Sequence, residues 1–271
     1  MREFKIIKEN NWIIGVKNDY RENGFLERIK ELFLNPKIEK EKFPSRGIRP
    51  VFSFIYNNRE FIFRFYQHGG IAKGVFKDIF LFNPAIKEIS LIEKLRKNEI
   101  LTFEPIGFVS KKYFAAFFRT ALVTKRMLGY ENLLTYLKEE KNFSTNNKKI
   151  TGNLINVLRN LYNLNFYHND LNVKNFLINP KNLSIAIIDW KKCRLKHRVS
   201  SKDKVKNIIR LNRSLEKYGI KVNDKLKMKF FLNFIREYAV SVFERKQLMK
   251  LCNHSFYLHK LTWEKQKEIH V

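Results

Sequence analysis

The chain has 271 residues, 44% of them hydrophobic, which is enough for one two-lobed domain or two small domains with a buried core. Its 54 Lys and Arg residues against 26 Asp and Glu residues give a formal net charge of +28. We therefore expect anionic partners: nucleic acid, nucleotide phosphates, an anionic membrane leaflet or a phosphorylated glycolipid. Composition alone does not separate them.

The cysteines and the apolar segments bear on the compartment. Cys193 and Cys252 are far apart and lack metal-ligand spacing, which indicates reduced thiols in a reducing compartment. The N-terminus is interrupted by charges too often for a secretory signal, and no apolar run approaches the roughly 18 residues that cross a bilayer. We expect a cytoplasmic protein that attaches to a membrane surface at most.

The N-terminal half is predicted to contain strands and one helix. Residues 51–56 and 60–66 alternate in polarity around two asparagines that tolerate the positive φ of a tight turn, which predicts a β-hairpin. An Asn-Pro pair followed by apolar residues at helical spacing predicts a helix over residues 83–97. Further strand-like sequence at 113–118 and 121–124 leads to a plausible hinge, Met-Leu-Gly.

The C-terminal half turns helical. Leucines and a valine at helical spacing predict an amphipathic helix over 154–164, and two short strands follow at 176–178 and 184–188. This order suits a small β-rich lobe, residues 1–126, on a larger, mainly helical lobe, residues 127–271.

The clearest chemical signal is the sequence H-N-D-L-N-V-K-N at residues 168–175, followed by Asp189 in I-I-D-W. It resembles the catalytic loop and metal-binding segment of protein kinases and related phosphotransferases. In phosphoryl transfer a carboxylate orients and deprotonates the attacking hydroxyl, and oxygen ligands hold Mg²⁺ on the phosphates of ATP. Asp170 fits the first role, and Asn175 and Asp189 fit the second.

Two neighbours in this loop have further expected roles. The resemblance implies that His168 braces the backbone of the loop. Lys174 stands directly before the metal-binding Asn175, where a cation could neutralise the transferring phosphate; the alternative is an ordinary exposed lysine.

The N-terminal half should supply a cation for the nucleotide phosphates and a carboxylate that holds it. Arg64 lies in the second hairpin strand, where kinases usually have lysine, and Glu88 lies on the apolar stripe of the following helix. We therefore expect Arg64 to pair with Glu88. Arg46 and Gly47 precede the hairpin and fit a phosphate-covering loop, although they lack the full GxGxxG pattern and could form an ordinary turn.

Together these residues resemble the lipopolysaccharide kinase family, and within it the kinases of 3-deoxy-D-manno-octulosonic acid (Kdo). The resemblance covers roughly residues 45–218 and rests on Arg46-Gly47, Arg64 with the Gly69-Gly70 exit, Lys87-Glu88, the D-L-N loop from Asp170 and the basic helix at 207–217. The most discriminating feature is arginine in place of lysine at position 64.

The resemblance implies an α+β, two-lobed protein-kinase-like fold and an enzyme that uses ATP and Mg²⁺. The γ-phosphate would pass to a hydroxyl of Kdo linked to lipid A, and the enzyme would be peripheral on the cytoplasmic face of the inner membrane. Trp190-Lys191 replaces the Phe-Gly of protein kinases, and no Ala-Pro-Glu segment follows. We therefore expect no protein substrate.

Two alternatives stay open. A small-molecule phosphotransferase of the aminoglycoside or choline type also ends its metal strand in Ile-Asp-Trp, but commonly has a second His where this chain has Asn172. An inactive kinase fold that binds nucleic acid would suit the charge, but would not need Asp170, Asn175 and Asp189, and no specific nucleic-acid motif is present. Residues 191–229 carry 15 Lys and Arg, which form either a solvated helical face or a surface for lipid phosphates.

Overall fold

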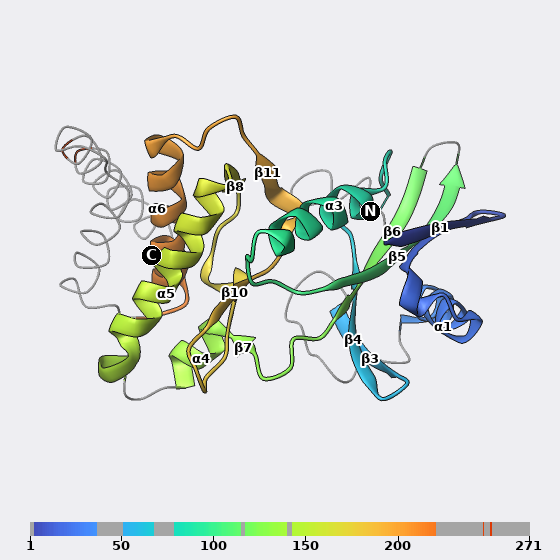
Figure 1. Cartoon of the computed structure of the whole chain (residues 1–271), viewed down its shortest axis with the longest axis horizontal. Helices are drawn as coiled ribbons and strands as arrows, with labels where there is room; N and C mark the ends of the chain where they lie inside the picture. The colour runs from blue at the N-terminus through green and yellow to red at the C-terminus, as the bar shows by residue number, and fades with distance from the viewer. Residues whose placement is uncertain are drawn as a thin grey trace, which may run out of the picture. The chain divides into compact units, whose positions relative to one another are not determined.

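The computed structural model of the chain describes residues 3–36, 51–67, 79–114, 117–139 and 143–220, together with Lys246 and Lys250. The predicted phosphate loop at Arg46 and Gly47 and the Gly69-Gly70 exit lie outside the described residues. The chain divides into two compact units, Met1–Leu128 and Gly129–Val271 (Figure 1). None of the helices in the described part combines the length and apolar character that a membrane-spanning segment needs.

The first unit is built on an antiparallel sheet of six strands in the order β1-β2-β5-β6-β4-β3. The strands are β1 (Phe4–Glu9), β2 (Trp12–Lys17), β3 (Val51–Tyr56), β4 (Arg59–Phe65), β5 (Pro105–Phe114) and β6 (Phe117–Lys125). A short 3-10 helix, η1 (Asn18–Tyr20), and helix α1 (Asn23–Leu34) follow β2. Helix α3 (Pro84–Lys97) precedes β5.

The predicted hairpin is confirmed as β3 and β4. Asn57 and Asn58 both have positive φ, 47° and 58°, which is the backbone of a two-residue turn that follows the twist of the strands. The strand predicted at 113–118 is wrong as a single strand, because β5 ends and β6 begins within it, and Phe114 pairs with Phe117. The segment contains none of the Gly, Pro, Asn or Asp residues that usually signal a turn, so the sequence gives no sign that one strand ends and another begins.

Both faces of the sheet are covered, and strand β4 shows how. Its alternate residues Phe61, Phe63 and Phe65 are fully buried in one cluster with the apolar side of α1. Burial of each phenylalanine contributes roughly 1.5–3 kcal/mol. Because neighbouring side chains on a strand point to opposite faces, Arg64 lies on the other face. Tyr66, just beyond the strand, packs there in a second cluster with Ala85 and Ile89 of α3.

Helix α3 begins where the Asn-Pro signal predicts. The side chain of Asn83 accepts a hydrogen bond from the backbone N–H of Ala85 at 3.0 Å, which caps the helix. The same side chain donates to Ser110 Oγ of β5 at 2.8 Å, and Ser110 in turn bonds to Thr120 of β6 at 2.9 Å. The start of α3 is therefore fixed to the sheet through buried polar groups.

The second unit contains the predicted short strands between helices. Strands β9 (Phe176–Ile178) and β10 (Ile185–Ile187) are confirmed, and with β7 (Glu131–Asn132) they form one small sheet. Strands β8 (Phe166–His168) and β11 (Cys193–Leu195) form another. The helices are α4 (Leu133–Glu139), α5 (Phe143–Asn163) and α6 (Ser201–Lys217), and the helix predicted from residue 154 is the later part of α5. Short 3-10 turns follow β8 and β10: η3 (Val173–Asn175) and η4 (Trp190–Lys192).

A close approach in the first unit leads to a test of the sheet. The ring of Phe108 lies across Gly15 on the neighbouring strand, and a Cβ at position 15 would overlap it. We expect Gly15→Ala to destabilise the protein by about 1–3 kcal/mol, as overpacking does. The matched change Gly152→Ala in helix α5 meets no atom within 4 Å and should stabilise by about 0.5–1 kcal/mol. Thermal unfolding midpoints that move in the same direction for both variants would contradict this account.

Candidate functional site

An ion pair links the sheet to α3 on the inner face of that helix. Arg64 Nη2 donates to Glu88 Oε1 at 2.5 Å, so the pairing predicted from the sequence is present. The Glu88 side chain is only 2% exposed and that of Arg64 16%. A carboxylate buried this deeply is costly unless every oxygen is bonded.

Tyr66, for which the sequence predicted no role, completes this arrangement. Its hydroxyl donates to the second oxygen of Glu88, Oε2, at 2.6 Å. The guanidinium of Arg64 also lies 5.1 Å from the centre of the Tyr66 ring. Both carboxylate oxygens therefore have donors, and the arginine is held from two sides. Arg64 and Tyr66 are two residues apart, so in an extended segment their side chains point to the same face. This spacing is the sign in the sequence that both could reach Glu88.

In the second unit, His168 joins the two acidic segments of the predicted site. The side chain is fully buried at the end of β8. Its Nδ1 accepts a hydrogen bond from the backbone N–H of Asp170 at 3.3 Å, and its Nε2 lies 3.0 Å from the backbone oxygen of Asp189. These partners require a proton on Nε2 and none on Nδ1. Burial lowers the pKa of the imidazole, which favours this neutral form.

Asn175 forms the second link between these segments. Its side-chain nitrogen donates to the backbone oxygen of Asp170 at 2.7 Å, and its own backbone oxygen accepts from the N–H of Ile188 at 2.8 Å. Because the amide nitrogen is engaged, the amide oxygen is the end that remains suited to a cation. Asn175 is 6% exposed, so its position is tightly defined.

Asp189 sits at a sharp change of direction after β10. Its backbone is left-handed, with φ and ψ both 62°. Asp adopts this conformation more readily than most residues, at a cost of order 1–3 kcal/mol. The buried Trp190 and the hydrogen bond from His168 hold the backbone on either side of the turn. Strain at this residue is one sign of a functional position.

Asp170 is half-exposed and contacts a cation that was not predicted from the sequence. Lys192, in η4, forms an ion pair with Asp170 Oδ2. Partial burial raises the pKa of the Asp170 carboxyl, but the hydrogen bond and charge of Lys192 outweigh this, with a smaller contribution from Arg210. The pKa of Asp170 therefore lies below its ordinary value, and the group is an ionised carboxylate at neutral pH. In the sequence, the one local sign of this ion pair was that Lys192 follows Asp189 by three positions.

Helix α6 contacts the loop at residues 168–175 through Ser214. The backbone N–H of Val173 donates to Ser214 Oγ at 2.9 Å, and that hydroxyl donates to the backbone oxygen of Leu211 at 2.7 Å. A capping box formed by Ser200 and Asp203 fixes the start of the helix. The basic segment 207–217, on which part of the family resemblance rests, therefore lies in a helix that contacts the loop directly.

Lys174 is exposed, and its ammonium lies 4.2 Å from the centre of the Tyr218 ring at the end of α6. Its role toward a phosphate stays a prediction.

The donor set of the second unit fits Mg²⁺. The carboxylate of Asp189 and the amide oxygen of Asn175 are hard ligands, and Mg²⁺ is commonly held by one or two carboxylates together with substrate phosphates. Within the described residues no cluster of three or more His, Cys, Asp or Glu side chains could hold a metal by itself. Two protein oxygen ligands leave the other positions of an octahedral Mg²⁺ to phosphate oxygens and water, so this pair suits a metal that binds together with a nucleotide.

Comparison with known proteins adds to this geometry. The sequence model of the lipopolysaccharide kinase (Kdo/WaaP) family matches residues 44–238. The chain belongs to this family. The match contains both the Arg64–Glu88 pair and the loop at 168–175, and it confirms the resemblance found in the sequence. Family membership supports a phosphotransferase.

Two relatives of the lipopolysaccharide kinase family illustrate the range of similarity. The 3-deoxy-D-manno-octulosonic acid kinase of Pasteurella multocida is 28% identical over 159 residues, which cover 56% of this chain and 64% of that protein. The chain thus spans less than two thirds of that relative. A solved structure of WaaP in complex with acyl carrier protein has a TM-score of 0.52 at 13% identity and covers 81% of this chain and 92% of that one. It shows a shared fold.

The hydrogen bond from Tyr66 to the buried Glu88 can be tested. Tyr66→Phe should destabilise the protein by about 1.5–3 kcal/mol, because one oxygen of a buried carboxylate loses its donor. Tyr113→Phe is the matched control, since the Tyr113 side chain is 52% exposed and makes no hydrogen bond in the described part of the chain. Thermal unfolding measures both. Equal midpoints for the two variants would show that the Tyr66 hydroxyl does not stabilise the ion pair.

Proposed function

We propose that the protein is an ATP-dependent kinase that transfers the γ-phosphate to a hydroxyl of Kdo linked to lipid A. The observation that carries the proposal is the pair of hydrogen bonds by which one buried imidazole, His168, joins Asp170 to Asp189. These hydrogen bonds fix the backbone of Asp170, whose carboxylate would meet the acceptor, relative to that of Asp189, which would bind the metal. In this proposal residues 1–126 bind the nucleotide and residues 127–271 carry the catalytic groups.

Asp170 acts on the acceptor. As an ionised carboxylate it accepts a hydrogen bond from the acceptor hydroxyl and orients its oxygen. That oxygen bonds to the γ-phosphorus, the bond from phosphorus to the oxygen of the departing ADP breaks, and the hydroxyl proton passes to Asp170. Lys192 and, more weakly, Arg210 lower the pKa of this carboxyl below its ordinary value, so it is ionised when the acceptor binds.

Asn175 and Asp189 would hold Mg²⁺, which when bound neutralises charge on the phosphates. Arg64 binds the nucleotide phosphates through its planar, bidentate guanidinium. Glu88 and Tyr66 orient the arginine, because the carboxylate is buried and cannot move toward solvent. Arg46 and Gly47 cover the phosphates, and His168 keeps the loop in place.

The acceptor is inferred from charge and from the family. Cations next to Asp170 and the formal net charge of +28 favour an acceptor that already carries negative charge. Kdo linked to lipid A offers hydroxyls, a sugar carboxylate and phosphates. An acceptor of this kind places the enzyme peripherally on the cytoplasmic face of an inner membrane. The relative from Pasteurella multocida, a Kdo kinase, supports the same acceptor.

The roles of the acidic residues can be separated by experiment. Asp170→Asn should lower phosphate transfer by roughly 10²–10⁴-fold while ATP binding stays near normal, since general-base catalysis contributes this much. Asp189→Asn should weaken Mg²⁺-dependent ATP binding itself. Asp19→Asn, at an exposed position in the first unit, is the isosteric control. Radiolabel transfer and calorimetric titration measure the two effects, and full transfer activity in Asp170→Asn would remove the basis of the kinase assignment.

The acceptor is tested with defined substrates. We expect Mg²⁺- and ATP-dependent phosphate incorporation into Kdo-lipid A and none into lipid A without Kdo, with the product identified by mass spectrometry. Turnover of aminoglycosides or choline without incorporation into Kdo-lipid A would instead assign a small-molecule phosphotransferase. Nucleic-acid binding without any transfer would favour an inactive kinase fold.

A further inference from the structure

One face of helix α6 carries a row of five cationic side chains and no acidic one. Successive members of the row are four, four, three and four residues apart along the helix, so they lie within a sector of about 80° over roughly 22 Å of helix length. All are exposed. The members of this α6 stripe are Lys202, Lys206, Arg210, Arg213 and Lys217. Figure 1 shows α6 in orange within the second unit.

The stripe is unfavourable for the helix by itself. Like charges at spacings of three and four residues destabilise a helix by about 0.2–0.5 kcal/mol per pair, and a lysine in the first turn opposes the helix dipole. Considering only the residues that the structure describes, none of the five forms an ion pair. The two acids of α6 are engaged elsewhere: Asp203 bonds to Ser200 and Lys196, and Glu216 accepts from Asn212. An ordinary solvated helix would mix signs along this face.

The stripe is also fixed relative to the catalytic loop. Ser214 of the same helix holds the backbone of Val173 at 2.9 Å, and Arg210 within the stripe is close enough to lower the pKa of Asp170. A surface that binds the stripe therefore lies at a defined place with respect to the carboxylate that receives the acceptor.

We propose that the α6 stripe docks on the phosphate headgroups of an anionic membrane leaflet, and this inference rests on the lipid-linked acceptor of the proposed function. A helix surface is convex, so the stripe offers charges in a row over about 22 Å instead of surrounding one ion. Long, flexible lysine and arginine side chains suit a field of mobile headgroups. The stripe positions include no aromatic side chain on which a base could stack, which makes nucleic acid the less suitable polyanion.

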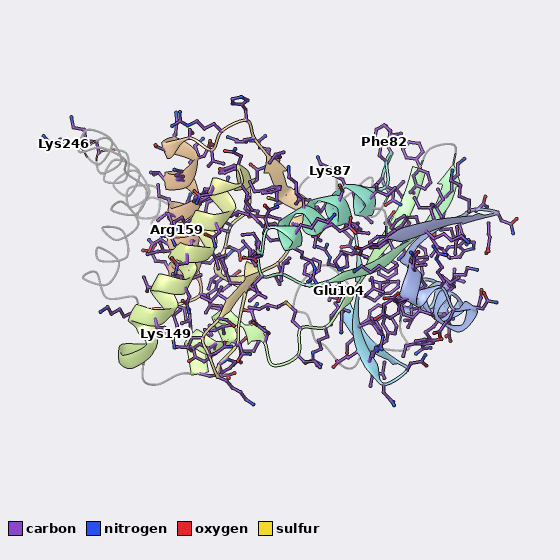
Figure 2. All side chains as sticks on the ribbon, in the orientation of Figure 1. Phe82, Lys87, Glu104, Lys149, Arg159 and Lys246 are labelled. Carbon is purple, nitrogen blue, oxygen red and sulfur yellow. The ribbon has the colours of Figure 1, made fainter. Side chains whose placement is uncertain are left out.

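A charge-matched pair of variants tests the stripe. The stripe variant carries glutamine at four of its positions and keeps Arg210, which acts on Asp170: Lys202→Gln, Lys206→Gln, Arg213→Gln and Lys217→Gln. The control variant removes the same number of charges from other exposed positions of the second unit: Lys138→Gln, Lys148→Gln, Lys149→Gln and Lys181→Gln. Figure 2 shows one of these, Lys149, toward the beginning of α5.

Binding is measured by co-sedimentation of the full chain with phosphatidylcholine vesicles with and without phosphatidylglycerol, at physiological salt. At this ionic strength charges farther away than about 8 Å are largely screened. Each lost cation weakens the attraction to the anionic surface, so the stripe variant should partition roughly tenfold less onto anionic vesicles. The control variant should stay within about twofold of the native chain. None of the three should bind neutral vesicles.

Several results would overturn the proposal. Equal losses in both variants would show that net charge, not the stripe, attracts the vesicle. A stripe variant that binds vesicles normally but loses affinity for an RNA or DNA fragment in fluorescence anisotropy would assign the stripe to nucleic acid.

Misfolding is checked by thermal unfolding, where relief of like-charge repulsion should leave the stripe variant at least as stable as the native chain. Because vesicle binding needs neither ATP nor acceptor, it fails or succeeds independently of kinase activity.

Discussion

One buried imidazole ring determines the geometry of the candidate site. His168 receives a hydrogen bond from the backbone of Asp170 and donates one to the backbone of Asp189, so it needs an acceptor and a donor at opposite edges of a rigid ring. Only neutral histidine supplies both. Burial lowers the pKa of the ring and so keeps it neutral, which means that the hydrophobic packing around β8 also fixes the hydrogen-bonding state on which the site depends.

Acidic groups are few in this basic chain, and those of the site are restrained by specific partners. Glu88 is bound by Arg64 and Tyr66, and Asp170 by Lys192. The two pairs differ in burial: the Glu88 side chain is 2% exposed, whereas that of Asp170 is 46% exposed. A buried pair is costly to separate and suits a structural clamp, while an exposed pair exchanges partners readily. The carboxylate expected to meet the acceptor is therefore the one whose cation is easily displaced.

The sequence predicted the parts that depend on short-range rules. The hairpin at residues 51–65, the capped helix α3 and the strands around the turn at residues 179–184 all follow from turn residues, caps and side-chain period. The first strands and α1 were missed, although α1 carries buried Phe25, Ile29 and Phe33 at helical spacing, because its N-cap residue, Glu22, is not one of the usual capping residues and makes no side-chain cap hydrogen bond. Lys192 was missed for a different reason. Its contact with Asp170 joins positions 22 residues apart, which no local pattern specifies.

The hydrogen bonds of the site explain how it can be built from few prescribed side chains. His168, Asn175 and Ser214 each bond to backbone groups, of Asp189, Asp170 and Val173 respectively. Backbone N–H and C=O groups are present whatever the side chain, so most positions around the loop can vary while the frame persists. The frame depends on a short list of polar side chains, of which the sequence pointed to His168 and Asn175, whereas the role of Ser214 follows only from its contact with Val173.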